Sequence, residues 1–374
     1  MPHIVIDIRR IGDFGIGTYI RNLIRALAAV DQENRYTLIV RPGETALPQD
    51  LGARFSTAVY GMPDTHLLHN LSFPRFLKQF RAKLYHIPLN SVAWWMPKPY
   101  VLTIHDMSSL LFPTRHDFRA TWHQERYRRG ALRASRVITV SNSTRRDIEH
   151  VLHVPARRIR TIYSAPDPAY SAALDPARDR QILDRYSIHH PFILYAGAIR
   201  PQKNIPRLIE AFAVLRADLE RAPEFSELRL VIIGDEITRN PAVRRAVAQA
   251  RIEPLVRFLG FVPTETLGVF YRAATLFAFP SLYEGFGLAP LEAMACGTPV
   301  LASDIPALVE AVGTAALLVS PDNVFDIKRG LHELLLDTAL RQRLSEAGRA
   351  QAARFQWERT AREVLSIYQE TLKN

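Results

Sequence analysis

Two glutamates with seven residues between them, Glu284 and Glu292, stand out for the chemistry that they could perform together. The segment between them contains Gly285 and Gly287, and the apolar run directly before it is typical of a buried strand. A carboxylate can accept hydrogen bonds from two hydroxyls at once, which suits the vicinal diols of a sugar. Taken singly, Glu284 could instead cap a turn and Glu292 could complement a helix dipole. The pair with two glycines between them favours a binding site.

The segment between the glutamates is expected to lead directly into a helix. Pro290 suits the first turn of that helix, and Gly297 suits its end. Such a turn directs the backbone N–H groups of Phe286, Gly287 and Leu288 toward a ligand. Because a helix N-terminus favours negative charge, that ligand is expected to be a phosphate. The same segment therefore combines groups for a sugar with groups for a phosphate.

A basic loop follows another expected strand, residues 192–196, and supplies a cation. Lys203 lies just before an expected helix at residues 205–218. An ammonium group at that place can stabilise a diphosphate leaving group, as a metal ion does elsewhere. The alternative is a solvated lysine near the start of a helix. Arg200 is a second candidate for the same phosphates, whereas Arg207 is interpreted as structural or solvated.

A histidine, His105, directly follows the expected strand at residues 100–104. The carboxyl ends of parallel strands are where ligands bind in open α/β sheets, so His105 is a candidate for the site. A lone histidine is nevertheless more often structural. His86 has a similar position near the end of residues 84–87, and a place in the core is as strongly favoured for it as a place in the site.

Short apolar runs that read as strands alternate with helix-length amphipathic segments along most of the chain. This alternation is the signature of a parallel sheet covered by helices on both faces. The pattern restarts after residue 190, so the predicted fold class is α/β, with two doubly wound, Rossmann-like domains facing each other across a cleft. The expected strands are residues 4–8, 36–40, 84–87, 100–104 and 136–140 in the first set, and 192–196, 229–233, 256–259, 275–279, 299–302 and 315–319 in the second.

The domain boundaries follow from length and composition. A chain of 374 residues is too long for one ordinary core and fits two domains. Residues 1–165 form the first, the Pro-, Asp- and Ala-rich residues 166–190 are interpreted as a linker, and residues 191–356 form the second. Apolar residues at helical spacing predict a last helix over residues 357–373, which is expected to pack back on the first domain.

The segment from Thr275 to Ser303 resembles the signature of the retaining GT-B glycosyltransferases of family 4, the glycosyl transferases group 1. That family has two glutamates at this spacing, a Gly-Phe-Gly-type core and an Ala-Met-Ala-Gly-like helix end. The resemblance extends over almost the whole chain. It implies a GT-B fold, a contact between Glu284 and the donor sugar near the reacting carbon, and ribose hydroxyls bound by Glu292. The second domain would then bind the nucleotide sugar, and the first would bind the acceptor.

The resemblance also implies roles for the other candidates. His105 would contact the donor sugar and support the charge that develops at its anomeric carbon, and Lys203 would bind the diphosphate. Many family members have an arginine directly after the glycine of this loop, where this sequence has Ala198, so Arg200 is expected to substitute for it. The remaining residues implied to line the donor site are Gly15 and Gly17 near the phosphate and the acceptor, Gly234, Phe261 and Val262 near the base, and Phe286, Gly287 and Leu288 at the helix start.

The charge of the chain favours an anionic partner. The formal net charge is +11, and arginine supplies most of the excess without a long basic tract. Nucleic acid is therefore the least favoured of three partners, behind a phosphorylated small molecule and an anionic membrane surface. The arginines and aromatics of residues 115–136 and the segment Trp94-Trp95-Met96 could meet such a membrane. Equally, they could form a solvated helix face and a packed core.

A single cysteine suits a reducing cytoplasm, and no apolar run is long enough to span a bilayer. The expected location is therefore cytoplasmic, peripheral on the inner face of the membrane. No Asp-x-Asp motif stands in a suitable loop, so neither a metal nor another cofactor is expected.

The predicted function is retaining transfer of a hexose from a nucleotide-diphosphate sugar to a glycan or lipid-linked acceptor in surface-polysaccharide synthesis, such as that of lipopolysaccharide. The early Gly-Ile-Gly-Thr-Tyr loop resembles bacterial mannosyl- or rhamnosyl-type enzymes, which favours GDP-mannose as donor. Two alternatives stay open. A sugar-nucleotide 2-epimerase of the same architecture would need no acceptor, and a nucleic-acid-binding protein would show salt-sensitive affinity for oligonucleotides.

Overall fold

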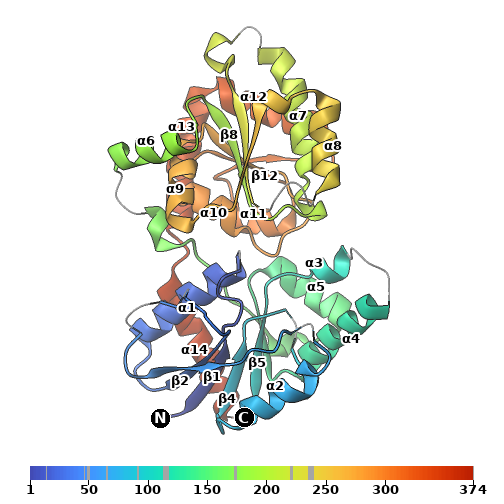
Figure 1. The fold of residues 1–374 in the computed structure, drawn as a ribbon, viewed down its shortest axis with the longest axis vertical. Helices are drawn as coiled ribbons and strands as arrows, with labels where there is room; N and C mark the ends of the chain where they lie inside the picture. Colours follow the sequence, from blue (N-terminus) through green and yellow to red (C-terminus); the bar gives the residue numbers. More distant parts are fainter. Residues whose placement is uncertain are drawn as a thin grey trace. The chain divides into compact units, whose positions relative to one another are not determined.

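The computed structural model describes residues 1–13, 15–45, 47–48, 51–64, 66–90, 92–112, 118–171, 175–219, 222–234 and 240–373. The chain divides into two compact units (Figure 1). The first comprises Met1–Ser164 together with Gln356–Asn374, and the second comprises Ala165–Phe355. Each unit is a parallel sheet with its own helices.

The sheet of the first unit has the strand order β3-β2-β1-β4-β5-β6-β7, and neighbouring strands run parallel. The order reverses between β1 and β4, as in other doubly wound sheets. These central strands are almost entirely buried because helices cover both faces of the sheet. The strands are β1 His3–Asp7, β2 Arg35–Val40, β3 Phe55–Val59, β4 Leu84–Ile87, β5 Tyr100–Ile104, β6 Arg136–Thr139 and β7 Ile159–Thr161.

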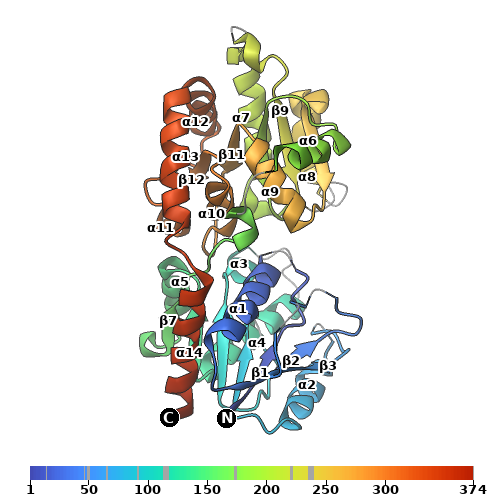
Figure 2. The same ribbon diagram turned by 90° about the vertical axis from the view of Figure 1, so that its left-hand side faces the viewer.

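The helices of the first unit come from both ends of the chain. Helix α14 packs against α1, which lies more than 300 residues earlier in the sequence (Figure 2). Its Tyr368 hydroxyl bonds to Nδ1 of His86 in β4 at 2.6 Å, so the last helix is part of this core. The helices are α1 Ile16–Val30, α2 His69–Lys78, α3 Ser108–Leu111, α4 Phe118–Arg133, α5 Asn142–Leu152, the short 3₁₀ turn Ala156–Arg158, and α14 Trp357–Lys373.

The sheet of the second unit has the order β10-β9-β8-β11-β12-β13, and it is also parallel. Here the order reverses between β8 and β11. Buried apolar runs form both of these central strands, as expected for strands covered on two faces. The strands are β8 Phe192–Ala196, β9 Arg229–Ile233, β10 Val256–Gly260, β11 Leu276–Phe279, β12 Val300–Ser303 and β13 Leu317–Val319.

Residues 166–190, which the composition suggests as a linker, lie within the second unit. Within them, α6 (Pro176–Arg185) is tied to α9 (Thr264–Ala273) by a two-bond ion pair between Asp179 and Arg272, with both N–O distances 2.8 Å. The other helices of this unit are α7 Ile205–Asp218, α8 Pro241–Ala250, α10 Leu288–Ala295, α11 Pro306–Val312, α12 Val324–Leu336 and α13 Thr338–Ala352.

Candidate functional site

The two loops with the strongest sequence signals leave neighbouring strands of the second sheet. One loop leaves β8 and reaches Lys203, and the other leaves β11 and reaches Glu284. Strands β8 and β11 are the pair at which the strand order reverses. In open parallel sheets, ligands bind outside the carboxyl ends of strands at this switch point. The fold therefore brings Lys203 and Glu284 to the position that is most favourable for a ligand.

Backbone and side-chain hydrogen bonds fix the two loops to each other. The Leu282 amide donates to the carbonyl of Gln202 at 2.7 Å. The buried amide group of Asn204 donates to the carbonyls of Pro280, at 3.0 Å, and Pro321, at 2.7 Å. Asn204 has a left-handed backbone, with a φ of 61°, a conformation that asparagine tolerates better than most residues. Lys203 is thus held in place by the residue that follows it.

Lys203 and Glu284 form a close ion pair. The Lys203 Nζ lies 2.6 Å from Oε1 and 2.8 Å from Oε2 of Glu284. Their side chains are 18% and 10% exposed, and the ammonium also lies 5.3 Å from the centre of the Phe279 ring. Little water screens a pair with this burial, so removing either partner leaves the other charge poorly compensated. A ligand with phosphates and hydroxyls offers a partner to each of the two groups.

Glu292 has different surroundings from Glu284. The sequence suggests that Glu292 lies in the first turn of its helix. Helix α10 begins at Leu288, however, so Glu292 lies in the second turn. The helix dipole acts mainly within the first turn, so complementing the dipole does not explain this residue. Glu292 is 8% exposed and accepts a hydrogen bond from the Tyr271 hydroxyl at 3.3 Å. Burial, followed by the charge of Glu292, holds the pKa of Tyr271 well above its usual value, so the phenol stays a donor.

The start of α10 depends on close packing between helices. Gly287 has a φ of 129°, and a Cβ there would lie 2.8 Å from Cδ2 of Leu308 in α11. The glycine is thus required by its neighbouring helix, whatever approaches it from solvent. Phe286 is buried and packs edge-on against Phe355, with ring centres 5.5 Å apart. Any contact of Phe286 with a ligand would therefore come from its backbone.

The remaining candidates of the second unit lie at other strand ends. Gly234 follows β9, and a Cβ there would collide with the carbonyl oxygen of Gly197. After β10, Val262 is buried and Phe261 is 66% exposed. Arg200 donates to the carbonyl of Ile199 at 3.2 Å. Residues 235–239, which include Asp235, lie outside the described residues.

In the first unit, His105 lies against α1, the helix that follows the loop containing Gly15. Gly15 precedes α1 with a φ of 64°, and a Cβ at Gly17 would collide with the Ile11 carbonyl. The Tyr19 ring of α1 meets the His105 ring edge-on, with centres 4.7 Å apart.

The hydrogen bonds of His105 define its protonation. Its Nε2 donates to the Pro88 carbonyl at 3.1 Å, and burial lowers its pKa. A carbonyl can only accept, so the proton of the neutral ring lies on Nε2 and Nδ1 carries a lone pair. That lone pair can accept a hydroxyl or face a developing positive charge.

His86 belongs to the core. Its Nδ1 bonds to the Tyr368 hydroxyl at 2.6 Å, and its Nε2 bonds to Oγ1 of Thr103 at 2.8 Å. Full burial lowers its pKa to about 3. Both nitrogens are used within the fold, which favours the structural interpretation.

Sequence reasoning missed the two residues that position the site, Asn204 and Tyr271. Asn204 directly follows Lys203, and an asparagine next to a charged loop residue is a weak signal. Tyr271 gives none, because its contact with Glu292 joins two helices. Within the described residues, no group of three His, Cys, Asp or Glu side chains is arranged to hold a metal ion. Nor does any helix there have the length and apolarity needed to cross a membrane.

Comparisons with known proteins agree with this architecture. The family model for glycosyl transferases group 1 matches residues 185–351, and that for glycosyltransferase family 4 matches residues 15–170. The O-antigen chain mannosyltransferase B of Escherichia coli is 32% identical over 308 residues, which cover 81% of this chain and 78% of that protein. Sucrose-phosphate synthase from Thermosynechococcus elongatus aligns over 99% of both chains, with a TM-score of 0.78 and 21% identity. Anabaena HepE in complex with UDP-glucose aligns over 99% of this chain and 100% of its own, with a TM-score of 0.78 and 17% identity.

Proposed function

Because the chain belongs to the GT-B glycosyltransferases of family 4, the glycosyl transferases group 1, it is a glycosyltransferase, and we propose that it transfers mannose from GDP-mannose with retention of configuration. The acceptor is a glycan or lipid-linked sugar in the synthesis of a surface polysaccharide. The mannosyltransferase named among its relatives supports this choice of sugar and process.

The Lys203–Glu284 pair at the switch point of the second sheet is the observation that carries the proposal. When a donor binds, the ammonium of Lys203 neutralises the diphosphate, together with the N-terminus of α10. The carboxylate of Glu284 then accepts hydroxyls of the sugar near the reacting carbon. Glu292, fixed by Tyr271, accepts the ribose hydroxyls. His105 contributes the lone pair of its neutral ring to the sugar, where positive charge develops at the anomeric carbon.

Lys203 takes the role that a divalent cation has in other sugar transferases, so we propose that transfer needs no metal. Activity is expected to persist after treatment with EDTA, and a dependence on added Mg²⁺ or Mn²⁺ would contradict this part of the proposal.

A thermal-shift panel of GDP- and UDP-sugars tests the donor. A ligand that binds only the folded state raises Tm. At a ligand concentration of 100 times Kd, the free energy of unfolding increases by about 2.7 kcal/mol. GDP-mannose is expected to give the largest shift, and the Lys203→Met variant is expected to lose most of it. A larger shift with a UDP-sugar would show that the donor is that sugar nucleotide and would leave the proposed transfer reaction intact. No shift with any sugar nucleotide would overturn both the proposed donor and the proposed transfer reaction. Release of an epimerised sugar nucleotide without an acceptor would favour the 2-epimerase alternative.

An exposed apolar cluster supports contact with an anionic membrane, which we propose as the place where lipid-linked acceptors are met. Leu67, Leu68 and Leu71 are 71%, 60% and 65% exposed, and Trp95 is 55% exposed. The two segments adjoin, because the Trp94 amide donates to Oδ1 of Asn70 at 3.2 Å. Exposed apolar groups of this kind often mark a contact surface.

Fewer residues of the segments 94–96 and 115–136 are exposed than the sequence suggests. Met96 and Arg126 are buried, so neither can meet a membrane. The guanidinium of Arg129 lies 4.8 Å from the centre of the Trp94 ring, beside the apolar cluster. Residues 113–117, which include Arg115, lie outside the described residues.

A further inference from the structure

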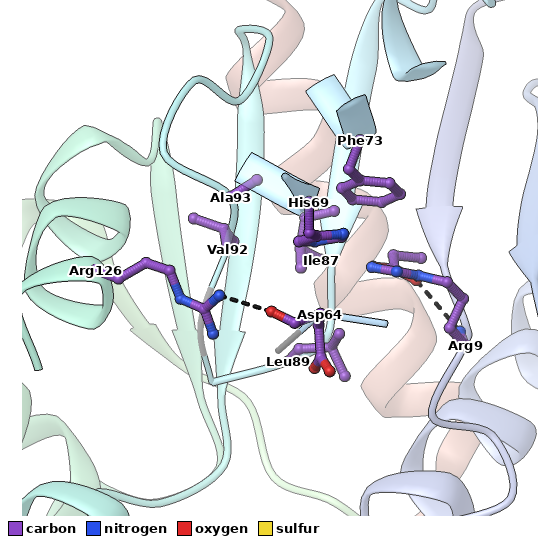
Figure 3. Close-up of a pocket in the computed structure, with 10 residues that line it drawn as sticks. Arg9, Asp64, His69, Phe73, Ile87, Leu89, Val92, Ala93 and Arg126 are labelled. Atoms are coloured by element: carbon purple, nitrogen blue, oxygen red, sulfur yellow. Dashed lines mark hydrogen bonds and ion pairs between the residues drawn. The ribbon is translucent and has the colours of Figure 1, made fainter. Parts of the chain in front are cut away.

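A small pocket opens at the switch point of the first sheet, the counterpart of the position of Lys203 and Glu284 in the second (Figure 3). Asp7, the last residue of β1, and Ile87, the last residue of β4, both line it. These strands are the pair at which the order of this sheet reverses, so ligands are favoured there on topology alone. None of its residues was selected from the sequence as a candidate for the donor or acceptor site, although Arg126 belongs to the basic segment at residues 115–136.

The charges around the pocket are balanced and held in place. Arg9 donates from Nε to Oδ1 of Asp7 at 2.8 Å, and from its terminal nitrogen to Oδ2 at 2.6 Å. Asp64 accepts from Arg10 through its carboxylate at 2.6 Å, and from Arg126 through its backbone carbonyl at 2.8 Å. Arg126 and Arg9 approach from opposite sides, with Asp64 and His69 between them (Figure 3). Two guanidiniums and two carboxylates around the same small space suit an uncharged polar ligand better than an anion.

His69 supplies an unused polar atom at this place. The side chain is 3% exposed, and its ring stacks on Phe73 with centres 4.8 Å apart. Among the described residues, its buried Nδ1 has no hydrogen-bond partner. Buried polar atoms in folded proteins nearly always have one, so Nδ1 is available to a ligand group or a water that enters the pocket. Burial, together with the charge of Arg9, lowers the pKa of His69 to about 4, so the ring is neutral near pH 7.

A neutral imidazole has one donor and one acceptor nitrogen, and a hydroxyl group can pair with either because it both donates and accepts. The pocket has a volume of about 10 Å³, which is close to the smallest cavity that holds one water. We propose that this pocket is a specificity subsite for a single hydroxyl of the acceptor's terminal mannose, with His69 as the residue that recognises it. The inference rests on the proposed function and on the family resemblance, which implies that the first unit binds the acceptor.

The test pairs substitutions at His69 with removal of single hydroxyls from the acceptor. The probes are octyl α-D-mannopyranoside and its four monodeoxy analogues, with the nucleotide sugar that gives the largest thermal shift as donor. The analogue that lacks the reacting hydroxyl cannot be extended. Among the other three, the wild-type enzyme is expected to lose about 10-fold or more in kcat/KM with one, because a buried hydrogen bond is left unmade. The His69→Phe variant keeps the stacking on Phe73 and is expected to abolish that one penalty, while its kcat/KM values with the other analogues, relative to the full mannoside, stay as in the wild type. The donor KM is expected to stay within about twofold, because only the acceptor contact changes.

Two further variants complete the design. His69→Asn restores a polar atom near the place of Nδ1 and is expected to regain part of the discrimination, and it replaces His69→Phe if the latter does not fold. His66→Phe, at an exposed histidine just before α2, is expected to behave as wild type.

The inference is overturned if the wild type discriminates against none of the three analogues that can be extended, or if the penalty persists in the His69 variants, as it would with a structural water alone. It is equally overturned if the donor binds but octyl mannoside is neither bound nor extended. Failure of every nucleotide sugar to bind would instead overturn the proposed function.

Discussion

At the scale of single residues, Lys203 and Glu284 hold each other at the point where a bound donor would need both. The ion pair keeps two charged groups ordered before the donor arrives, at the cost of taking both partly out of water. When a donor binds, Lys203 and Glu284 can exchange each other for the donor with little movement of the backbone, because the two loops are fixed by Asn204 and by the amide of Leu282. The pair is therefore best understood as a preorganised site.

The Glu284→Gln substitution removes the charge and keeps the size of the side chain. If the carboxylate stabilises the transition state, kcat is expected to fall about 10²- to 10⁴-fold. The donor thermal shift is expected to persist, because Lys203 still meets the diphosphate. Steady-state kinetics with the mannoside acceptor measures the effect, and Glu333→Gln in α12, where the side chain is 42% exposed, is the matched control. A loss below about threefold would contradict a role in the transition state.

The residue types at this site could be selected from the sequence, but their contacts could not. Lys203 and Glu284 are 81 positions apart, and only the sheet order shows that their loops leave neighbouring strands. His69 was missed because nothing in the surrounding sequence distinguishes it from an exposed histidine such as His66. Its importance comes from the buried Nδ1, which has no hydrogen-bond partner in the part of the chain that the structure describes, and this is a property of packing.

At the scale of elements, the first turn of α10 is set by its contact with α11. The Gly287→Ala substitution forces a Cβ against Leu308 and places an L-residue at a φ of 129°. We expect a loss of about 1–3 kcal/mol in the free energy of unfolding, since such backbone strain has that cost. Gly12→Ala is the control, because a Cβ there meets nothing within 4 Å. Equal Tm values for the two variants would show that the α10–α11 contact does not constrain Gly287.

Sequence patterns identified the buried strands and missed the marginal ones. Strands such as β8 and β11 are continuous apolar runs, so their places could be predicted. Strand β3 is largely exposed and β7 has three residues, so neither has a clear apolar signal. Residues 166–190, which lie within the second unit, gave no apolar signal for a related reason. Helix α6 buries none of its side chains fully, so its attachment through Asp179 and Arg272 leaves no apolar pattern.

At the scale of the molecule, the first unit is expected to be acid-labile. His86 has a pKa of about 3 in the fold and 6.5 when unfolded, so below pH 6.5 the unfolded chain binds more protons. Its contribution is complete above pH 6.5 and declines as the pH falls toward 3. At pH 5 the loss is about 2 kcal/mol from this residue alone. His69 has a lowered pKa of about 4 and acts in the same direction.

Tryptophan fluorescence can follow this loss, because Trp94, Trp95, Trp122 and Trp357 all belong to the first unit. The urea midpoint of the fluorescence change is expected to be lower at pH 5 than at pH 7.5. The His86→Gln variant is less stable at pH 7.5 but is expected to lose part of the pH dependence. Equal midpoints at the two pH values in the wild type would contradict the neutral, buried state of His86.

The proposed membrane attachment rests on two properties of the chain, its net charge of +11 and the exposed apolar cluster around Leu71 and Trp95. The protein is expected to sediment with vesicles that contain phosphatidylglycerol and to be released by salt, which screens the attraction. The double variant Leu71→Ser/Trp95→Ser is expected to bind the vesicles at least about 10-fold more weakly, because two apolar side chains no longer leave water. Phe325→Ser, at a 69% exposed residue of the second unit, is the control. Equal losses in the two variants would show that general surface hydrophobicity, and not this cluster, governs the binding.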